Sequence, residues 1–327
     1  MTERILVTGG AGYIGAHACK ALARAGYEPV TFDNLSTGWA DAVRFGPFER
    51  GDLLDPERLA EVMARHRPAA VLHFAALSQV GEAARIPGRY WRNNVTGTLN
   101  LVEAALAAGC DRIVFSSTCA TYGDHDGILL DESTPQRPTN AYGASKRAIE
   151  DMLGNFAEAG LLRHVTFRYF NVVGADPEGD LGEQHDPETH LVPLMFDAAL
   201  GRRAALTIFG TDYPTPDGTC IRDYVHVCDL VGAHLLGLER LLSGGESRVY
   251  NLGTGRGFSV REMIGAAERV TGKTVPVIEG PRRPGDCACL VSGGRRAEAE
   301  LGWVPGRALE TIMADAWQWH QGPGYAG

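Results

Sequence analysis

The chain lacks the features that mark membrane proteins and nucleic-acid-binding proteins. Its best apolar stretch, residues 69–77, is interrupted by His73 and is far shorter than the ~18 residues that a membrane span needs. Lys and Arg total 31 against 40 Asp and Glu, which gives a formal charge of −9. Binding to nucleic acid or to an anionic membrane needs a basic face, so we expect neither partner. An anionic ligand must be held by a few placed arginines and backbone amides.

Cysteine is sparse, and repeats and low-complexity linkers are missing. Seven cysteines, an odd number scattered along 327 residues, fit reduced thiols in a cytoplasm better than a disulfide framework. The first four residues lead directly into a strand-like segment, so we expect no secretory signal. Hydrophobic residues make up 44% of the chain, which is ample for a core. At roughly 150 residues per domain, the length predicts about two domains.

The sequence does contain an alternation of short apolar runs and amphipathic segments. The runs predict buried strands at residues 4–8, 29–32, 70–74, 112–116 and 165–170. Between them, apolar residues recur at helical spacing: Ile14, Ala18, Leu22 and Ala25; Leu59, Val62 and Met63; and Val95, Leu99, Val102 and Leu106. Strand and helix in alternation predict an α/β fold with a doubly wound parallel sheet.

This alternation ends after Asn171. Residues 174–190 are rich in glycine, proline and acidic residues and predict an irregular loop at a domain junction. Residues 209–223 form a second long loop, whose length favours a functional role. We expect a first domain over residues 1–171, a smaller α/β domain over 172–320 whose segments can interleave with it, and a fraying tail at 321–327.

A glycine-rich turn follows the first predicted strand. Residues 9–15 (GGAGYIG) carry glycines at 9, 12 and 15, a variant of the dinucleotide-binding turn. Gly9 permits the tight turn, Gly12 lets the backbone approach a pyrophosphate, and Gly15 lets the helix pack on the strand. Asp33 ends the second strand, where a carboxylate accepts hydrogen bonds from a ribose diol and repels a 2′-phosphate. The pattern predicts a site for NAD rather than NADP.

Asp52 has two interpretations. It follows another apolar stretch, where its carboxylate can meet an adenine amino group. It can equally cap the helix that begins at Pro56.

A tyrosine and a lysine lie four residues apart in residues 142–146 (YGASK), which places Tyr142 and Lys146 on one helix face. A phenol with a pKa of about 10 is a poor base at neutral pH, but a nearby ammonium and a bound nicotinamide cation favour phenolate. Thr118 follows a strand at its carboxyl end, where parallel sheets bind ligands. We expect Tyr142 to act as the acid/base and Thr118 to share its proton with the substrate.

The glycine turn and the Y-x-x-x-K pair resemble the extended short-chain dehydrogenase/reductases. Later segments are more specific and are similar to the UDP-glucose 4-epimerases: RYFN at 168–171, IFGTDYPTPDGT at 208–219, IRDYVHV at 221–227, YNLG at 250–253 and RRPGD at 282–286. The resemblance covers residues 4–320. It implies an NAD-binding Rossmann domain at 1–171, a UDP-sugar-binding domain at 172–320 and a cytoplasmic homodimer.

The resemblance also implies a reaction and a set of site residues. A UDP-hexose is epimerised at C4 by transient oxidation to a 4-keto sugar, with tightly bound NAD regenerated in each turnover. The catalytic residues are Tyr142, Lys146 and Thr118. The implied cofactor site comprises Gly9, Gly12, Tyr13, Ile14, Gly15, Asp33, Asn34, Asp52, Leu53, Phe74, Ala75, Ala76, Asn94, Ser116, Tyr142, Lys146 and Phe170. The implied substrate site comprises Thr118, Tyr142, Asn171, His190, Arg222, Arg283 and Asp286.

Several positions depart from the best-known bacterial members of this family. Thr118 stands where serine is usual and keeps the hydroxyl. Ser78 replaces a lysine that in some members reaches the cofactor phosphates, and His190 replaces an asparagine. Leu290 is of intermediate size at the position that gates N-acetylated sugars, so UDP-N-acetylhexosamine, UDP-pentose and UDP-uronate stay open as substrates.

Other patterns carry weaker alternatives. His185, Asp186, Glu188 and His190 crowd one loop, but their spacing matches no known metal motif, so we expect a solvated acidic loop and no metal. We expect Cys287 and Cys289 to be inert thiols, His73 to be a core histidine, and Trp317 and Trp319 to make packing or dimer contacts. A sugar-nucleotide dehydratase is disfavoured because Cys119-Ala120 offers no second acid/base pair. A catalytically inactive NAD-binding regulatory protein is the alternative from another class.

Overall fold

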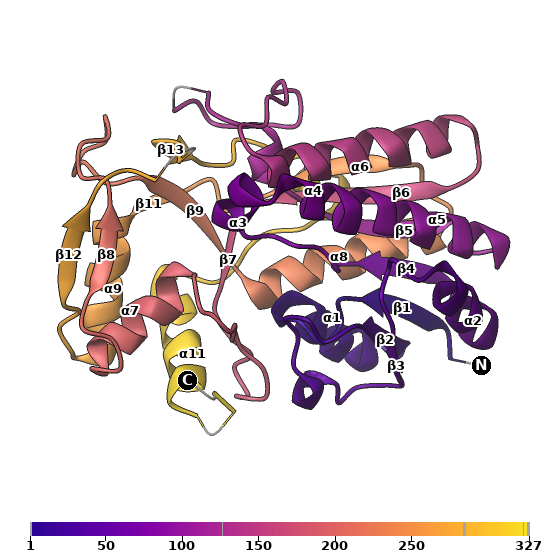
Figure 1. Cartoon of the computed structure of the whole chain (residues 1–327), viewed down its shortest axis with the longest axis horizontal. Helices are drawn as coiled ribbons and strands as arrows, with labels where there is room; N and C mark the ends of the chain where they lie inside the picture. Colours follow the sequence, from indigo (N-terminus) through magenta and orange to yellow (C-terminus); the bar gives the residue numbers. More distant parts are fainter. Residues whose placement is uncertain (1, 126, 284–285, 323, 326–327) are drawn as a thin grey trace.

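The computed structural model describes residues 2–125, 127–283, 286–322 and 324–325. Its larger part is a seven-stranded sheet in the order β10-β6-β5-β4-β1-β2-β3, in which all neighbours run parallel (Figure 1). Its strands are β1 (Arg4–Thr8), β2 (Glu28–Asp33), β3 (Phe48–Arg50), β4 (Ala70–His73), β5 (Arg112–Thr118), β6 (Arg163–Tyr169) and β10 (Arg248–Leu252). The predicted doubly wound α/β class is confirmed.

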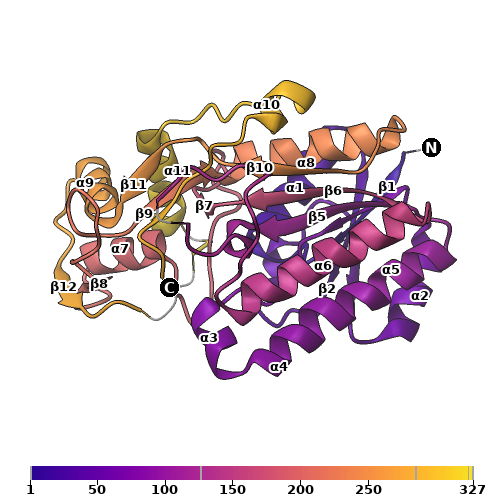
Figure 2. The ribbon, with the colours of Figure 1, turned by 90° about the horizontal axis from the view of Figure 1, so that it is seen from above.

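Helices cover both faces of this sheet, which is why its central strands are almost continuously apolar (Figures 1 and 2). One face packs against α1 (Tyr13–Arg24) and α8 (Val227–Leu242). The other packs against α2 (Pro56–His66), α5 (Gly97–Ala107) and α6 (Ala141–Glu158). Shorter helical segments are a 3-10 turn at Ala40–Ala42, α3 (Val80–Arg85), α4 (Pro87–Tyr90), a π-helical turn at Trp91–Thr96 and a 3-10 turn at Cys119–Thr121.

A second, smaller part contains two further sheets. In one, β9 (Ile221–His226) pairs with β7 (Asn171–Val173), β11 (Gly257–Ser259) and β13 (Cys289–Leu290). The other pairs β8 (Leu206–Phe209) with β12 (Val277–Gly280). A separate core joins these strands to α7 (Leu191–Ala199), α9 (Val260–Thr271) and α11 (Leu309–Gln321). Ser259 and Glu262 cap α9 reciprocally, which fixes where that helix begins.

All five predicted strands are present in the seven-stranded sheet, but the sequence patterns missed the two other strands of that sheet. β3 is a three-residue edge strand with an exposed Phe48, and β10 begins with an arginine, so neither shows a buried apolar run. The predicted stripe of α5 was partly wrong. Thr98, Leu101, Val102 and Ala105 are buried, whereas Val95, Leu99 and Leu106 are only partly covered.

The division at residue 171 stays a prediction, and the chain returns across it. α8 and β10 join the first sheet, and α10 (Arg296–Leu301) packs beside them, as interleaved segments allow. The predicted tail begins one residue too early, because α11 extends to Gln321. Fraying of the tail stays a prediction; in the structure the ring centroid of Tyr325 lies 3.9 Å from that of His320. Residues 323, 326 and 327 of that tail lie outside the described residues.

Within the described ranges, no helix has the length and apolar character needed to cross a membrane. All seven cysteines fall within these ranges and are free thiols, and five of them are buried. His73 is the satisfied core histidine that we expected, with Nδ1 2.6 Å from Thr8 Oγ1 and Nε2 2.8 Å from Thr98 Oγ1. Trp317 packs on Phe196 within the second core.

Candidate active site

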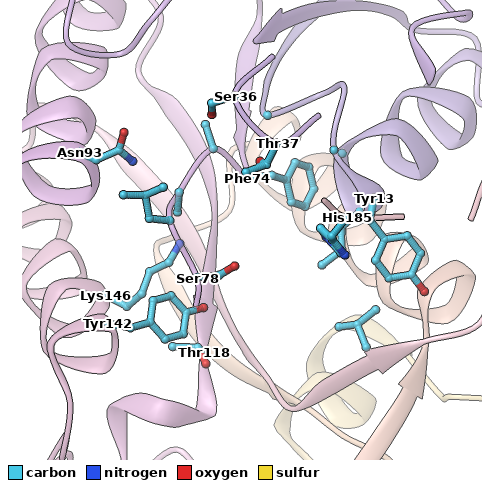
Figure 3. Close-up of a pocket in the computed structure, with 18 of the residues that line it drawn as sticks. Tyr13, Ser36, Thr37, Phe74, Ser78, Asn93, Thr118, Tyr142, Lys146 and His185 are labelled. Atoms are coloured by element: carbon cyan, nitrogen blue, oxygen red, sulfur yellow. The ribbon is translucent and has the colours of Figure 1, made fainter. Parts of the chain in front are cut away.

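A cavity of about 400 Å³ opens at the carboxyl ends of the first sheet's strands and extends toward the second part (Figure 3). Most of the predicted cofactor residues line it, as do four of the predicted substrate residues. The predicted residues on its wall are Gly9, Gly12, Tyr13, Ile14, Gly15, Asp33, Asn34, Asp52, Leu53, Phe74, Ala75, Ala76, Thr118, Tyr142, Lys146, Phe170, Asn171 and His190.

The glycine turn forms the floor of one end of the cavity. Gly9 has φ +74, and a Cβ there would lie 2.6 Å from the backbone nitrogen of Ala75. At Gly15 a Cβ would lie 2.1 Å from the carbonyl oxygen of Gly9. The turn therefore tolerates only glycine at both positions, and it places the N-terminus of α1 at the cavity. That N-terminus has no acidic residue in its first turn, so its partial positive charge is free to attract an anion.

The carboxylates of Asp33 and Asp52 lie at the same end of the cavity as the glycine turn. Asp33 accepts hydrogen bonds from the backbone nitrogens of Ala11 at 3.0 Å and Leu35 at 2.8 Å, which fixes it beside the turn. Burial raises the pKa of Asp33, and these two bonds oppose the shift. Asp52 accepts from Asn34 Nδ2 at 2.9 Å. The helix-cap interpretation of Asp52 was wrong.

The cap of α2 is instead Asp55, whose Oδ1 accepts from the backbone nitrogen of Arg58 at 3.0 Å. Asp52 lies three residues before this cap, and its Oδ1 accepts instead from the backbone nitrogen of Leu54 at 2.9 Å. Its carboxylate is thus left on the cavity wall.

Tyr142, Lys146 and Thr118 point into the middle of the cavity together (Figure 3). Asn140 caps α6 through the backbone nitrogen of Gly143 at 2.9 Å and so fixes where the helix presents Tyr142 and Lys146. Thr118 ends β5, and its hydroxyl accepts from the backbone nitrogen of Ala120 at 3.1 Å. One helix face and one strand end thus supply the predicted catalytic group.

Burial shifts the pKa values of both Tyr142 and Lys146. It raises the pKa of Tyr142 well above its ordinary value, and the hydrogen bond with Thr118 opposes that shift. Burial lowers the pKa of Lys146 to about 7, against the charge of Glu150. Lys146 Nζ donates to the carbonyl oxygen of Ser116 at 2.7 Å. Desolvation is the largest influence on the pKa of Tyr142 in the chain alone, and the effect of the ammonium and of a bound nicotinamide stays a prediction.

Two predicted cofactor residues lie behind the cavity wall. Asn94 is fully buried and holds the residue 77 backbone, accepting from Leu77 N at 2.9 Å and donating to Leu77 O at 3.0 Å. The hydroxyl of Ser116 bonds to that of Tyr169, and its carbonyl receives Lys146. Neither residue lines the cavity, and direct cofactor contact stays a prediction for both. Asn93 lines the cavity instead.

Arg222, Arg283 and Asp286 gather beside the cavity but do not line it. Arg283 Nε donates to Asp286 Oδ2 at 3.0 Å, and Arg222 Nη2 lies 3.8 Å from Asp286 Oδ1. The Arg283 guanidinium stands 4.8 Å from the ring of Phe209. Arg222 is close enough to Cys119, on the cavity wall, to oppose the burial that raises the pKa of that thiol to about 12. Residues 284–285 of the RRPGD segment lie outside the described residues.

The loop before α7 differs from its prediction. We expected a solvated acidic loop, but the Glu183 and Glu188 side chains are only 8% and 9% exposed. His190 Nδ1 lies 3.2 Å from Glu183 and 3.1 Å from Glu188. Burial disfavours the charged imidazole, yet the two carboxylates raise the pKa of His190 to about 9. The loop folds inward because the indole nitrogens of Trp39 and Trp319 hold the carbonyls of residues 184 and 183, so the Trp319 contact is internal packing.

Sequence reasoning missed several residues of the cavity wall. Sequence reasoning gave their side chains no role in a cavity: Val80 begins α3, Tyr169 ends β6 and Val172 lies in β7. Ser78 was considered for its departure from the family pattern and does line the cavity. The missed residues are Phe32, Ser36, Thr37, Gly51, Leu77, Val80, Asn93, Cys119, Ala120, Tyr169, Val172, Glu183 and His185.

Comparisons with known proteins agree with this arrangement. A profile of the NAD dependent epimerase/dehydratase family matches residues 5–253. A UDP-glucose 4-epimerase of Rhizobium leguminosarum bv. trifolii is 53% identical over 318 residues, which cover 97% of both chains. The crystal structure of UDP-glucose 4-epimerase from Brucella ovis in complex with NAD is 48% identical, with a TM-score of 0.94 over 97% of this chain and 98% of that one.

A third relative carries two ligands. The UDP-glucose-4-epimerase from Stenotrophomonas maltophila, with bound NAD and formylated UDP-arabinopyranose, is 40% identical, with a TM-score of 0.94 over 98% of both chains. The family profile covers more than half of this chain, and the identities extend over nearly all of it. The chain therefore belongs to the NAD dependent epimerase/dehydratase family.

Proposed function

We propose that the chain catalyses the NAD-dependent interconversion of UDP-glucose and UDP-galactose by inverting C4 of the sugar. The observation that carries this proposal is the convergence of Thr118, Tyr142 and Lys146 in one cavity with a glycine turn at its end. Full-length relatives at about half identity that are UDP-glucose 4-epimerases support the choice of reaction.

The cavity fits NAD. The free N-terminus of α1 suits a pyrophosphate, and the absence of Cβ atoms at Gly9 and Gly15 keeps the backbone close to it. Asp33 is held by two backbone nitrogens in a position to accept from ribose hydroxyls and to repel a 2′-phosphate. When bound, NAD supplies a hydride acceptor and donor. The bound cofactor would also be flanked by other residues of the cavity wall: Phe74, Ala75, Ala76 and Phe170.

Tyr142 moves the proton. It takes the proton of the sugar's 4-hydroxyl as C4 is oxidised and returns it when the 4-keto sugar is reduced on its other face. The buried phenol needs a positive charge to ionise, because desolvation holds its pKa high. Tyr142 would gain that charge from a bound nicotinamide cation, so it would act as the acid/base only in the loaded enzyme. Lys146 would bind the nicotinamide ribose and add to the effect, and Thr118 would bridge the phenol and the sugar.

The second part of the chain holds the nucleotide of the substrate. Arg222 and Arg283 supply planar guanidinium groups that match the oxygens of a diphosphate. Asp286 lies between them and would bind the uridine ribose, while Asn171 and His190 on the cavity wall contact the phosphate or sugar. Holding the substrate by its diphosphate leaves the 4-keto sugar free to turn between oxidation and reduction.

Other UDP-sugars form the second candidate group. Leu290 is half-buried and packs against the cluster of Cys119, Tyr122, Leu130 and Phe170 near the reacting groups, where its size limits the sugar's substituents. We also propose that the chain forms a cytoplasmic homodimer, a location with which seven free thiols are consistent. Sedimentation equilibrium tests the dimer.

Tyr142→Phe tests the proposed function. It removes one hydroxyl, so NAD content should be unchanged while epimerisation of UDP-galactose falls by about 10²–10⁴-fold. Tyr27→Phe, on a tyrosine that packs against the core away from the cavity, is the matched control and should keep full activity. Wild-type turnover by Tyr142→Phe would refute the mechanism. Tight NAD binding without turnover of any UDP-sugar would instead favour the regulatory protein.

A further inference from the structure

A small apolar cluster forms the cavity wall beside Thr118. Its buried members are Cys119, Tyr122, Leu130 and Phe170, against which Leu290 packs. Cys119 and Phe170 line the cavity, whereas Tyr122 is completely buried and does not line it. Tyr122 is therefore no member of the catalytic group, and its hydroxyl must have another role.

The hydroxyl of Tyr122 bonds to two side chains of the large sheet. It donates to Asn251 Oδ1 at 2.6 Å and accepts from Arg168 Nη1 at 3.0 Å. Both partners are buried as well, with Asn251 1% and Arg168 7% exposed. Burial raises the pKa of Tyr122 to about 12, so the hydroxyl keeps its proton at neutral pH and remains a donor. The 3-10 turn at Cys119–Thr121 is thus anchored to the sheet through the residue that follows it.

The two anchoring side chains are held in place by the sheet and by the catalytic helix. Asn251 in β10 and Arg168 in β6 lie directly opposite each other. Arg168 Nη2 donates to Glu150 Oε2 at 2.6 Å, and its Nε donates to the same oxygen at 2.9 Å. Glu150 lies one turn after Lys146 in α6 and also accepts from the hydroxyl of Ser117 in β5. The anchor is therefore built on the same helix and strand as the catalytic residues.

The same anchor holds a second segment of the wall. Asn251 Nδ2 donates to the carbonyl oxygen of Leu130 at 2.9 Å. That carbonyl also accepts from the backbone nitrogen of Gly293 at 2.7 Å, and the Leu130 nitrogen donates to the carbonyl of Val291 at 2.9 Å. Leu130 is thereby joined to the segment after β13, a strand that pairs with β9 beside Arg222. The wall thus connects the catalytic part of the chain to the part that would hold the nucleotide.

The hydroxyl of Tyr122 requires an explanation that its ring does not. A phenylalanine would fill the same volume, and Arg168 already has a charge partner in Glu150. The hydroxyl adds direction, because one donated and one accepted bond fix the ring relative to the sheet, whereas apolar packing is non-directional. Fixing the ring also fixes Cys119 and Phe170, which belong to the same cluster and face the cavity.

We propose that Tyr122 is a positioning residue that keeps the wall formed by Cys119 and Phe170 rigid beside the sugar of the substrate. Because the 4-keto sugar must turn between the two hydride transfers, strong bonds to it would oppose inversion. A rigid wall instead limits how far the sugar moves while it turns, and so returns C4 to the reacting groups. This inference rests on the proposed function and concerns only the sugar, since the nucleotide would be held by the other part of the chain.

Tyr122→Phe tests this role by kinetics and by binding. It removes the hydroxyl and keeps the ring, so the wall remains but loses its fixed position. We expect kcat for UDP-galactose to fall by about 10–100-fold, since a displacement of about 1 Å costs about 10²-fold. The affinity for UDP, measured by isothermal titration of the NAD-loaded protein, should match wild type because UDP carries no hexose to confine. The NAD content should also match wild type.

Tyr250→Phe is the matched control. Tyr250 is also completely buried in the large sheet, and its hydroxyl donates to Glu300 Oε2 at 3.0 Å. Neither residue lines the cavity. The variant therefore loses a buried hydrogen bond of the same kind, and it should lose thermal stability as Tyr122→Phe does while keeping wild-type kcat.

Asn251→Leu provides a second test of the same contact. It removes the acceptor of the Tyr122 proton and the donor to Leu130, so kcat should fall while UDP affinity is kept. Because both substitutions act on one contact, the double variant Tyr122→Phe/Asn251→Leu should lose less kcat than the product of the two single losses.

Three results would overturn the positioning role. One is a wild-type kcat in either Tyr122→Phe or Asn251→Leu purified with NAD. Another is an equal fall of kcat in Tyr250→Phe, because the loss would then follow stability. The third is a loss of UDP affinity as large as the loss of kcat, which would place the effect at the nucleotide. A wild-type chain that binds NAD but turns over no UDP-sugar would instead refute the proposed function.

Discussion

Gly15→Ala tests the geometry of the cofactor turn most directly. The added Cβ would lie 2.1 Å from the carbonyl oxygen of Gly9, whereas real Cβ atoms stay at least 3.0 Å from such atoms. The turn or the helix must therefore move by at least about 0.9 Å. Because the obstructing atom is backbone, no side-chain rotation relieves the clash.

The size of the effect follows from two opposing contributions. Overpacking costs about 1–3 kcal/mol, and a backbone clash belongs at the upper end of that range. Alanine in a helix is favoured over glycine by about 0.5–1 kcal/mol, and Gly15 lies in α1. The net loss of about 2 kcal/mol should lower Tm by about 4–8 °C, taking about 2–4 °C per kcal/mol. A turn displaced by nearly 1 Å should also lose NAD and cost about 10²-fold in activity.

Gly154→Ala is the matched control. Gly154 lies in α6, and no described atom outside its own helix backbone and chain neighbours would come within 4 Å of the added Cβ. Thermal unfolding should show an unchanged or higher Tm, and NAD released by denaturation should match wild type. If Gly15→Ala kept wild-type Tm and NAD content, the close packing of helix on turn would be the wrong account of this glycine.

Three further outcomes are expected. Asp33→Ala should lose NAD during purification without a change of fold, because the carboxylate lies at the end of a strand. The NAD released by denaturing the purified variant measures this, and an undiminished NAD content would contradict the role of Asp33 in cofactor binding. In NAD-free protein, burial lowers the pKa of Lys146 to about 7, so unfolding between pH 7 and 10.5 takes up a proton. The free energy of unfolding of the wild type should therefore rise from pH 7 to 10.5 relative to that of Lys146→Met. Urea titrations at each pH measure both, and the same pH dependence in the two proteins would contradict this. Glu150→Gln leaves the buried Arg168 guanidinium without its charge partner, so it should lower the free energy of unfolding in urea by about 3–5 kcal/mol. A loss below about 1 kcal/mol would contradict the importance of the buried Glu150–Arg168 pair.

The parts of the fold that the sequence predicted are those whose signal is local. A strand covered on both faces must be apolar throughout, so β1, β4 and β5 were visible in the sequence. Gly9 and Gly15 were predictable because no other residue meets their steric demands. Tyr142 and Lys146 share a helix face, so their spacing alone brings them together.

What the sequence missed depends on contacts between distant segments. The inward fold of residues 183–190 is set by Trp39 and Trp319, which lie about 145 and 136 positions away. No periodicity encodes such a contact, so an acid-rich loop was taken to be solvated. The hydrogen bonds of the Asn94 side chain with the backbone of Leu77 are of the same kind, since they join residues 17 positions apart that no periodicity connects.

The proposed reaction makes opposite demands on the two parts of the chain, and the contacts between them meet both. Hydride transfer requires the cofactor and the phenol to stay fixed, while inversion requires the oxidised sugar to turn between two transfers. Lys20 of α1 is nearly buried and pairs with three carboxylates of the junction loop, and Tyr13 donates to the carbonyl of Gly174 at 2.6 Å. These contacts lock the junction to the cofactor side of the cavity. Freedom is therefore confined to the sugar, because Arg222 and Arg283 on the other side would hold the substrate only by its diphosphate.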